Sequence, residues 1–182
     1  MTHQLGVILA GGQSLRFGGA GACPKPIVRI NGNPMVLWAA AQLVQSGARR
    51  ICVLTGQNHT AICDGLGLGQ PLAQLQVGDV SVPFELRPSG VGCGTAGRLL
   101  ALMPGELGAG ALIAYTDVFT RSSLTDLKDL RQSKDAALAI LTMAPGAPWG
   151  IVETADGHVK GFAEKPVPVS YTHLTLPTIL LV

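Results

Sequence analysis

The chain has 182 residues, of which 47% are hydrophobic and 13% are charged, so it can form a packed core and is not intrinsically disordered. Its net charge of +2 excludes the strongly basic surface that marks proteins binding nucleic acids or membrane surfaces. Glycine (24) and proline (12) together make up 36 of the 182 residues, which predicts many turns and few long helices.

The sequence carries no signal for a membrane or for secretion. No apolar run approaches the roughly 18 residues that a membrane-spanning helix needs, and the N-terminus lacks the pattern of a secretory signal. Cys23, Cys52, Cys63 and Cys93 form neither a C-x-x-C pair nor a cluster with histidine. We therefore expect free thiols, a cytoplasmic location and no membrane partner.

The first third of the chain has the pattern of a strand, a helix and a second strand. Residues 6–10 are a continuous apolar run that ends at glycine, as expected for a strand buried on both faces. A helix is expected to begin at Asn33-Pro34, with Asn as its cap, and to end at Gly47. Leu37 and Trp38 are expected in its buried face.

The remainder continues the alternation of strands and helices. Residues 64–83 have little periodicity and are interpreted as irregular surface structure. Residues 136–142 are interpreted as a central strand. Further strands are expected at 51–54, 84–87 and 111–115, helices at 95–103 and 123–133, and a hairpin at 151–154 and 159–163 with its turn at Asp156-Gly157. This alternation predicts an α/β protein with a mainly parallel sheet.

The last residues differ in composition from the rest of the chain. Residues 169–182 contain no Lys, Arg, Asp or Glu, and they end in Ile179-Leu180-Leu181-Val182, whereas an ordinary terminus is polar. We interpret residues 169–182 as a non-native tail and exclude them from the functional analysis. Residues 1–168 show no internal repeat or linker and are expected to form one incomplete domain.

A candidate phosphate site begins where the first strand ends, in Leu9-Ala10-Gly11-Gly12-Gln13-Ser14-Leu15-Arg16. Backbone N–H groups in such a glycine turn can bind phosphate oxygens, and the Arg16 guanidinium suits the same anions. The pattern fits neither the dinucleotide fingerprint nor the Walker loop. Pro24 and Pro26 flank Lys25, so the backbone is restricted and the direction of the ammonium group is fixed.

Several motifs, which keep the family's order along the chain, resemble the sugar-phosphate nucleotidyltransferases, also called nucleoside-diphosphate-sugar pyrophosphorylases. The family's L-A-G-G-x-G-T-R-L, P-K-P and G-x-P patterns correspond to residues 9–16, 24–26 and 32–34. The resemblance covers residues 5 to about 168. The other similar segments are Gly94-Thr95-Ala96-Gly97-Arg98-Leu99, Tyr115-Thr116-Asp117-Val118, Trp149-Gly150-Ile151-Val152 and Phe162-Ala163-Glu164-Lys165-Pro166.

The resemblance implies a three-layer αβα Rossmann-like fold and a Mg²⁺-dependent enzyme. Such an enzyme transfers a nucleoside monophosphate from an NTP to a sugar-1-phosphate, most simply a hexose-1-phosphate, and releases pyrophosphate. Arg16 and Lys25 would be catalytic, and Asp117 would bind the metal. The sugar phosphate would contact Gly150, Glu164 and Lys165, and the nucleotide would contact Leu9, Ala10, Gly11, Gly12, Ser14, Arg87, Pro88, Gly94, Thr95 and Ala96. No nucleic-acid partner is expected.

Departures from the family pattern leave two alternatives open. Ser14-Leu15 replaces the family's Gly-Thr, and this form of the loop also resembles the molybdenum-cofactor guanylyltransferases, whose loop leads into D-K. The G-T-A-G and E-K-P segments favour a sugar phosphate. The family's second metal-binding aspartate lies downstream of E-K-P, beyond the end of this chain, which leaves a non-catalytic module that binds nucleotide or sugar phosphate as the other alternative. We accordingly expect the 182-residue chain to be inactive or nearly so.

Overall fold

The computed structural model describes residues 4–12, 23–68, 72–103, 105–107, 110–122, 124–136, 139–141, 151–156, 158–163 and 179–181. The chain divides into two compact units, the first with Met1–Leu141 and Thr178–Val182, the second with Thr142–Pro177. Within the described ranges, no helix has both the length and the apolar character needed to cross a membrane.

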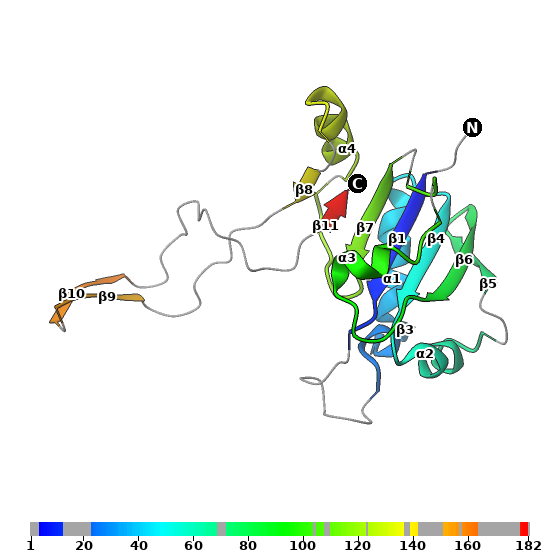
Figure 1. Ribbon diagram of the computed structural model, residues 1–182, viewed down its shortest axis with the longest axis horizontal. Coiled ribbons are helices and arrows are strands. Elements are labelled where there is room, and N and C mark those ends of the chain that lie inside the picture. Colours follow the sequence, from blue (N-terminus) through cyan, green and yellow to red (C-terminus); the bar gives the residue numbers. More distant parts are fainter. Residues whose placement is uncertain are drawn as a thin grey trace. The chain divides into compact units, whose positions relative to one another are not determined.

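A seven-stranded mixed sheet forms the centre of the first unit (Figure 1). Strands β6, β4, β1 and β7 run parallel to one another, whereas β5 and β11 are antiparallel to their neighbours. The predicted α/β class with a mainly parallel sheet is confirmed. The strand order is β5 (Leu72–Val77), β6 (Val80–Pro88), β4 (Arg50–Thr55), β1 (Leu5–Ala10), β7 (Ala111–Tyr115), β11 (Ile179–Leu181) and β8 (Ala139–Leu141).

Helices and an irregular segment pack on the two faces of this sheet. On one face, α1 (Met35–Gln45), α2 (His59–Gly65) and α4 (Leu124–Ser133) contribute to the larger hydrophobic cluster. On the other face, α3 (Thr95–Leu99) and the residues that follow it cover a smaller cluster. All six residues of β1 are buried, because both of its faces are covered. Apolar side chains on both faces therefore hold the central strands in place.

The beginning and the buried face of α1 differ from the prediction. Asn31 and Gly32, at φ +49° and +80°, form a tight turn that pairs β2 (Arg29–Ile30) with β3 (Asn33–Pro34). Asn33 therefore lies in a strand, and Pro34 is the N-cap residue. The Trp38 side chain is not in the core but 40% exposed, and its indole N–H donates to the Ile30 carbonyl at 3.0 Å. The buried face is formed by Met35, Val36, Ala39, Ala40, Leu43 and Val44.

Residues 64–83, expected to be irregular, contain the end of α2, all of β5 and the start of β6. Strands β5 and β6 form a hairpin in which Val77 pairs with Val80, and Gly78 in its turn has φ +57°. Strand β5 is an edge strand with exposed and half-buried positions only. It therefore lacks the apolar run that marks a buried strand.

Two other elements are shorter than predicted. The helix expected over 95–103 is α3, Thr95–Leu99, because Met103 precedes a proline and the intervening residues form tighter turns. The strand expected over 136–142 is β8, and it lies at the edge of the sheet rather than at its centre. Its Ile140 side chain is exposed.

The second unit contains a β-hairpin. Strands β9 (Ile151–Ala155) and β10 (His158–Ala163) pair antiparallel, with an irregularity between Val159 and Gly161. Asp156 follows β9 at φ +52°, a conformation that aspartate tolerates in turns. The predicted hairpin is thus confirmed.

Candidate functional site

A cleft of about 350 Å³ lies at the carboxyl ends of β1 and β7. From β1 the chain passes through α1 to β4 on one side, and later returns to β7 on the other side of β1. Such a switch point is where open α/β sheets bind ligands. The cleft is lined by Leu9, Ala10, Gly11, Gly12, Lys25, Pro26, Cys93, Gly94, Thr95, Arg98, Tyr115, Thr116 and Asp117.

The glycine turn after β1 forms one wall of the cleft, and close approaches explain why Gly11 has no side chain. A Cβ atom on Gly11 would clash with the guanidinium group of Arg98. A Cβ atom on Gly56, which follows β4, would lie 2.6 Å from the Gly11 carbonyl oxygen. Gly11 is therefore packed between two other segments, and a larger residue at either glycine would displace the turn.

Lys25 and Asp117 meet across the cleft. Lys25 begins a short 3₁₀ helix, η2 (Lys25–Ile27), between Pro24 and the buried Pro26, so the two prolines do restrict its backbone. Asp117 lies just after β7. The Lys25 Nζ atom lies 2.8 Å from Asp117 Oδ2, and the side chains are 34% and 40% exposed. The cleft thus holds an ammonium and a carboxylate that solvent and ligands can reach.

Arg98 projects from α3 toward the glycine turn. Its Nη2 donates to the Gly11 carbonyl at 2.8 Å, and its Nη1 donates to Ser89 Oγ at 3.1 Å and to the Gly90 carbonyl at 3.2 Å. Ser89 is buried, and its hydroxyl donates to the Thr55 carbonyl at 2.7 Å. Arg98 was not among the site residues predicted from the sequence. A cation directly after the G-T-A-G segment was the one available signal.

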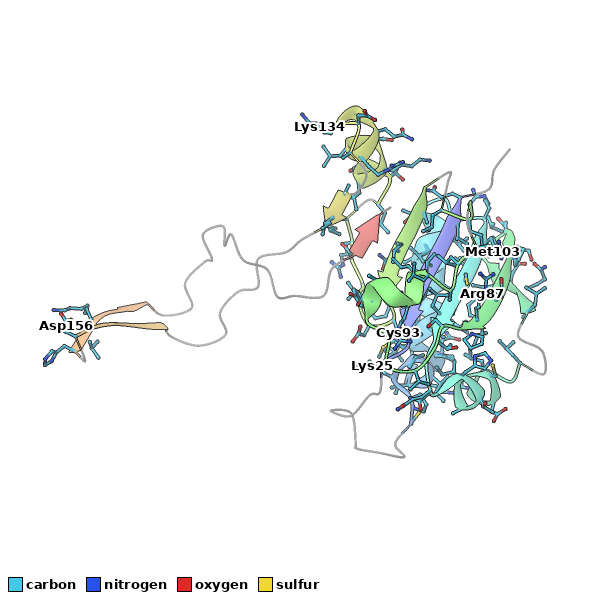
Figure 2. All side chains as sticks on the ribbon, in the orientation of Figure 1. Lys25, Arg87, Cys93, Met103, Lys134 and Asp156 are labelled. Carbon is cyan, nitrogen blue, oxygen red and sulfur yellow. The ribbon has the colours of Figure 1, made fainter. Side chains whose placement is uncertain are left out.

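Hydroxyl groups and a thiol fix the other walls. The buried Thr116 hydroxyl donates to the Leu9 carbonyl at 3.0 Å and so joins the ends of β7 and β1. Thr95 Oγ1 lies 3.3 Å from the Tyr115 hydroxyl. The Cys93 thiol donates to the Ser89 carbonyl at 2.9 Å. Figure 2 shows Lys25 and Cys93 at the same end of the sheet.

The structure brings together eight of the predicted site residues: Leu9, Ala10, Gly11, Gly12, Lys25, Gly94, Thr95 and Asp117 all line the cleft. Ala96, Arg87 and Pro88 do not line it. The roles assigned to Ser14, Arg16, Gly150, Glu164 and Lys165 fall outside the described residues and stay predictions.

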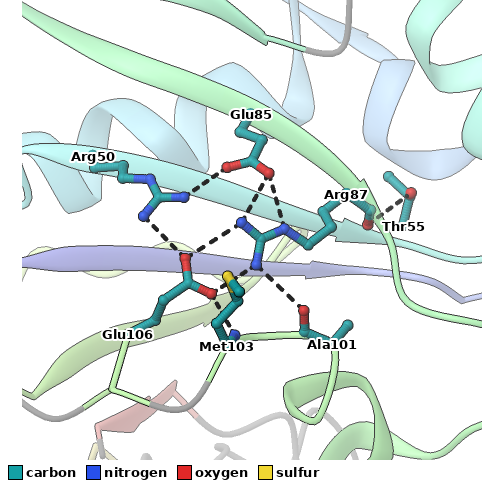
Figure 3. Close-up of polar contacts among 7 residues, drawn as sticks. All are labelled: Arg50, Thr55, Glu85, Arg87, Ala101, Met103 and Glu106. Atoms are coloured by element: carbon teal, nitrogen blue, oxygen red, sulfur yellow. Dashed lines mark hydrogen bonds and ion pairs between the residues drawn. The ribbon is translucent and has the colours of Figure 1, made fainter.

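Arg87, expected to contact the base, directs its guanidinium into an ion-pair network (Figure 3). It lies 2.8 Å from Glu85 and 2.7 Å from Glu106, and Arg50 pairs with the same two carboxylates at 2.8 and 2.9 Å. Arg87 also donates to the Ala101 carbonyl at 3.3 Å. The network fastens the segment after α3 to β4 and β6, so the Arg87 side chain has a structural part. Its contact with the base stays a prediction.

The network shifts the ionisation of its members. The hydrogen bonds from Arg87 lower the pKa of Glu106 to about 2. Hydrogen bonding to Glu106 in turn raises the pKa of Arg87 above its ordinary value. Burial alone would raise the pKa of Glu85, but hydrogen bonds from Arg50 and Arg87 outweigh it and hold that pKa below the ordinary value. All four groups are therefore charged near neutral pH.

A second cavity, which we call the side cavity, adjoins the cleft and has a volume of about 220 Å³. The two share Gly11, Gly12, Cys93, Gly94 and Arg98, and the side cavity adds Gln57, Val91 and Gly92. The residues that line both spaces therefore include glycine backbone and the Arg98 guanidinium but no carboxylate. A ligand with a flat group and an anionic tail could occupy both.

Asp117 is the carboxylate of the cleft and the candidate ligand for a metal ion. The described parts of the chain contain no group of three or more His, Cys, Asp or Glu side chains that could hold a metal ion. Mg²⁺ is usually held by one or two carboxylates together with the phosphates of the substrate. A half-exposed aspartate that lines a cleft of about 350 Å³ fits this kind of binding.

Comparisons with known proteins place the chain among nucleotidyltransferases. The family model of the MobA-like NTP transferase domain matches residues 6–148. The bifunctional protein GlmU from two strains of Acidithiobacillus ferrooxidans is 30% identical over 162 residues, which cover 87% of this chain and 32% of the relative. The chain thus spans about a third of the length of these curated relatives.

Solved structures show the same fold. A Bacillus anthracis structure described as a glucose-1-phosphate thymidylyltransferase in complex with sucrose has a TM-score of 0.57 at 18% identity, covering 98% of this chain and 70% of that chain. A UDP-glucose pyrophosphorylase complexed with UDP-glucose has a TM-score of 0.56 at 15% identity, covering 99% of this chain and 76% of that chain. These likenesses confirm the Rossmann-like fold expected from the sequence.

Proposed function

The chain belongs to the family of MobA-like NTP transferase domains, and from this premise we propose that it transfers a nucleoside monophosphate from an NTP to a hexose-1-phosphate, with Mg²⁺. The products would be a nucleoside-diphosphate sugar and pyrophosphate. The four cysteines, all within the described residues, are free thiols, which favours the reducing cytoplasm as the compartment.

The observation that carries the proposal is the pairing of Lys25 with Asp117 in a cleft walled by the glycine turn. A reaction between two polyanions needs positive charge at the reacting phosphate and a hard oxygen ligand for a divalent ion. The fold supplies one of each, within 2.8 Å, at the switch point of the sheet. Neither group is buried, so substrates can exchange for the ion pair.

The chemistry is an in-line displacement at the α-phosphorus. An anionic oxygen of the acceptor phosphate attacks, a new O–Pα bond forms, and the bond from Pα to the β-phosphate oxygen breaks with its electron pair leaving on pyrophosphate. The acceptor is already an anion, so no side-chain nucleophile or base is required. Catalysis then depends on positioning and on electrostatic stabilisation of the charge that builds on the transferred group.

Within this scheme Lys25 stabilises the non-bridging oxygens of the α-phosphate, and Asp117 would hold the metal. When bound, Mg²⁺ supplies charge neutralisation along the triphosphate. Lys25 exchanges its carboxylate partner for a phosphate oxygen as the nucleotide enters. The side cavity, with its glycine walls, is the space that we assign to the base. Arg16 would neutralise the leaving pyrophosphate, and Gly150, Glu164 and Lys165 would contact the sugar phosphate.

The name of the matching family favours a second candidate function. Together with the Ser14-Leu15 form of the glycine loop, it supports guanylyl transfer to a phosphorylated pterin of the molybdenum cofactor. The cleft chemistry would be the same, because only the acceptor differs. The two proposals therefore share the roles of Lys25 and Asp117 and differ in the acceptor, which is a hexose-1-phosphate in one and a phosphorylated pterin in the other.

The experiment that tests the proposal combines binding and turnover. Titration calorimetry of the chain with ATP, CTP, GTP and UTP, each with Mg²⁺, should reveal binding of at least one nucleotide. Because the 182-residue chain is expected to be nearly inactive, pyrophosphate release is then measured in a form extended beyond residue 168, with that nucleotide and either hexose-1-phosphates or molybdopterin. Release with a hexose-1-phosphate supports the first proposal, and release with molybdopterin alone supports the second. Tight nucleotide binding without release from any acceptor points to a binding module, and absence of binding contradicts all three.

A further inference from the structure

We infer that Arg98 is a positioning residue of the nucleotide site, whose guanidinium fixes the peptide between Gly11 and Gly12 and thereby the direction in which the glycine turn presents its N–H groups. The inference deepens the proposed function and rests on it, since it takes the ligand of the turn to be the phosphates of an NTP. Arg98 lies in the segment that resembles G-T-A-G, but no role was assigned to it from the sequence.

The geometry places Arg98 at the meeting point of two loops. The donor and acceptor of its bond to Gly11 are 87 residues apart, and the distance is 2.8 Å. The other nitrogen holds Ser89 and Gly90, which follow β6. The guanidinium therefore ties the end of β1 to the end of β6, on the side of the cleft where the side cavity opens.

A hydrogen bond to one carbonyl orients the next amide group as well. In a planar trans peptide the carbonyl oxygen of Gly11 and the N–H of Gly12 point in opposite directions. With the oxygen held by Arg98, the Gly12 N–H is directed to the opposite edge of the same plane. Two successive glycines have no Cβ atoms to restrict this plane, so an external anchor is needed to keep one orientation.

The charge of Arg98 is also available to a ligand. Among the described residues no carboxylate pairs with it, whereas Arg50 and Arg87 are each paired with two. Its three acceptors are a hydroxyl and two carbonyls, which leave the positive charge uncompensated beside the cleft. The planar fork of arginine serves acceptors in two directions, and the single ammonium of lysine cannot do so with the same geometry.

Three variants of the full chain test the inference: Arg98→Gln, Arg98→Lys and, as a matched control, Arg49→Gln. Arg49, like Arg98, donates to backbone carbonyls, those of Val44 and Ala48, but it lies before β4, at the opposite end of the strands from the cleft. The readout is the dissociation constant for the Mg²⁺-NTP that wild type binds most tightly, with the thermal midpoint measured in parallel.

Arg98→Gln and Arg98→Lys should each weaken nucleotide binding by about tenfold or more, the cost of one charge-assisted hydrogen bond, when binding is measured well below the thermal midpoint of each variant. Arg49→Gln should stay within about twofold. Binding by Arg98→Lys within about twofold of wild type would overturn the inference, because charge alone would then suffice. Wild type that binds none of the four nucleotides would defeat the proposed function and the inference with it.

A double-mutant cycle supplies a second, independent test. Gly11 does not have a positive φ, so alanine can adopt its backbone conformation, and the obstacle to Gly11→Ala is the Arg98 guanidinium. Gly11→Ala should weaken nucleotide binding in wild type and add almost nothing in an Arg98→Ala background. Losses that simply add would show that the two residues act separately and would overturn the inference.

Discussion

The ammonium group of Lys25 lies 2.8 Å from the Asp117 carboxylate, although 92 residues separate them in the sequence. One group is held by a proline-flanked turn after β1, and the other follows β7. Each neutralises the other in the unliganded protein. In the proposed function, the pair would separate when a triphosphate with its metal ion enters.

Replacing Lys25 with alanine should impair chemistry more than binding. In a form of the enzyme that releases pyrophosphate, we expect Lys25→Ala to lower kcat by about 100-fold or more while changing nucleotide affinity far less, because the ammonium acts on charge that develops in the transition state. Lys134→Ala, at an exposed position after α4, is the control. An unchanged kcat would remove Lys25 from the chemistry.

Replacing Asp117 with asparagine should change the Mg²⁺ dependence of nucleotide binding and leave the free energy of unfolding almost unchanged. The Asp117 side chain is 40% exposed, so loss of its ion pair with Lys25 should change the free energy of unfolding by less than about 1 kcal/mol. The Mg²⁺ concentration needed for half-maximal nucleotide binding should rise, because a neutral amide is a poorer ligand than a carboxylate. Urea unfolding and Mg²⁺ titrations measure the two effects. A metal requirement identical to wild type would rule out Asp117 as the ligand.

The ion-pair network around Glu106 should make the free energy of unfolding depend on pH. The pKa of Glu106 falls from 4.5 to about 2 on folding, so its stabilising effect is present above pH 4.5 and lost as the pH drops toward 2. Glu106→Gln should lower the free energy of unfolding by about 2 kcal/mol near pH 7. Urea unfolding at a series of pH values should show the gap in free energy of unfolding between wild type and Glu106→Gln closing between pH 4.5 and 2. A gap that is constant with pH would contradict the ionic origin.

The cysteines should differ in their reactivity. Burial raises the pKa of Cys52 to about 12, so native protein should leave this thiol unmodified by iodoacetamide at neutral pH. The exposed Cys23 should be modified. Cys93 lines both the cleft and the side cavity, so bound Mg²⁺-NTP should slow its modification. Peptide mass spectrometry quantifies each site. Equal labelling of Cys93 with and without nucleotide would place the ligand elsewhere.

The buried parts of the fold were predictable from the sequence. Strands β1 and β7 lie where apolar runs end in glycine or in Thr116-Asp117, because strands covered on both faces need apolar residues throughout. Strand β5 was not predictable in this way, because its residues alternate between exposed and half-buried positions and form no continuous apolar run. For α1 the helical period was correct and Leu37 packs partly buried against the core, but Trp38 was wrongly placed there. The β2–β3 turn supplies Trp38 with a carbonyl partner at the surface, and helical spacing does not contain that information.

In the candidate site, too, some residues could be predicted from the sequence and others could not. Lys25 and Asp117 follow motifs whose chemistry is local, so their positions at the end of a strand or between prolines could be inferred. The role of Arg98 depends on two loops that only the folded chain brings to it. Arg87 was assigned to the base from its place before the G-T-A-G segment, but Glu85 and Glu106 provide nearer partners for its charge.

The contacts around Gly11 have a consequence for engineering. The loops that follow β1, β4 and β6 converge there: Gly56 packs against its carbonyl oxygen, Ser89 bonds to Thr55, and Arg98 bonds to both Gly11 and Ser89. Replacing one of these loops with the corresponding loop of a relative that prefers another base would break its contacts with the other two loops. Changing which nucleotide this scaffold accepts should therefore require transplanting the three loops together with the residue at position 98.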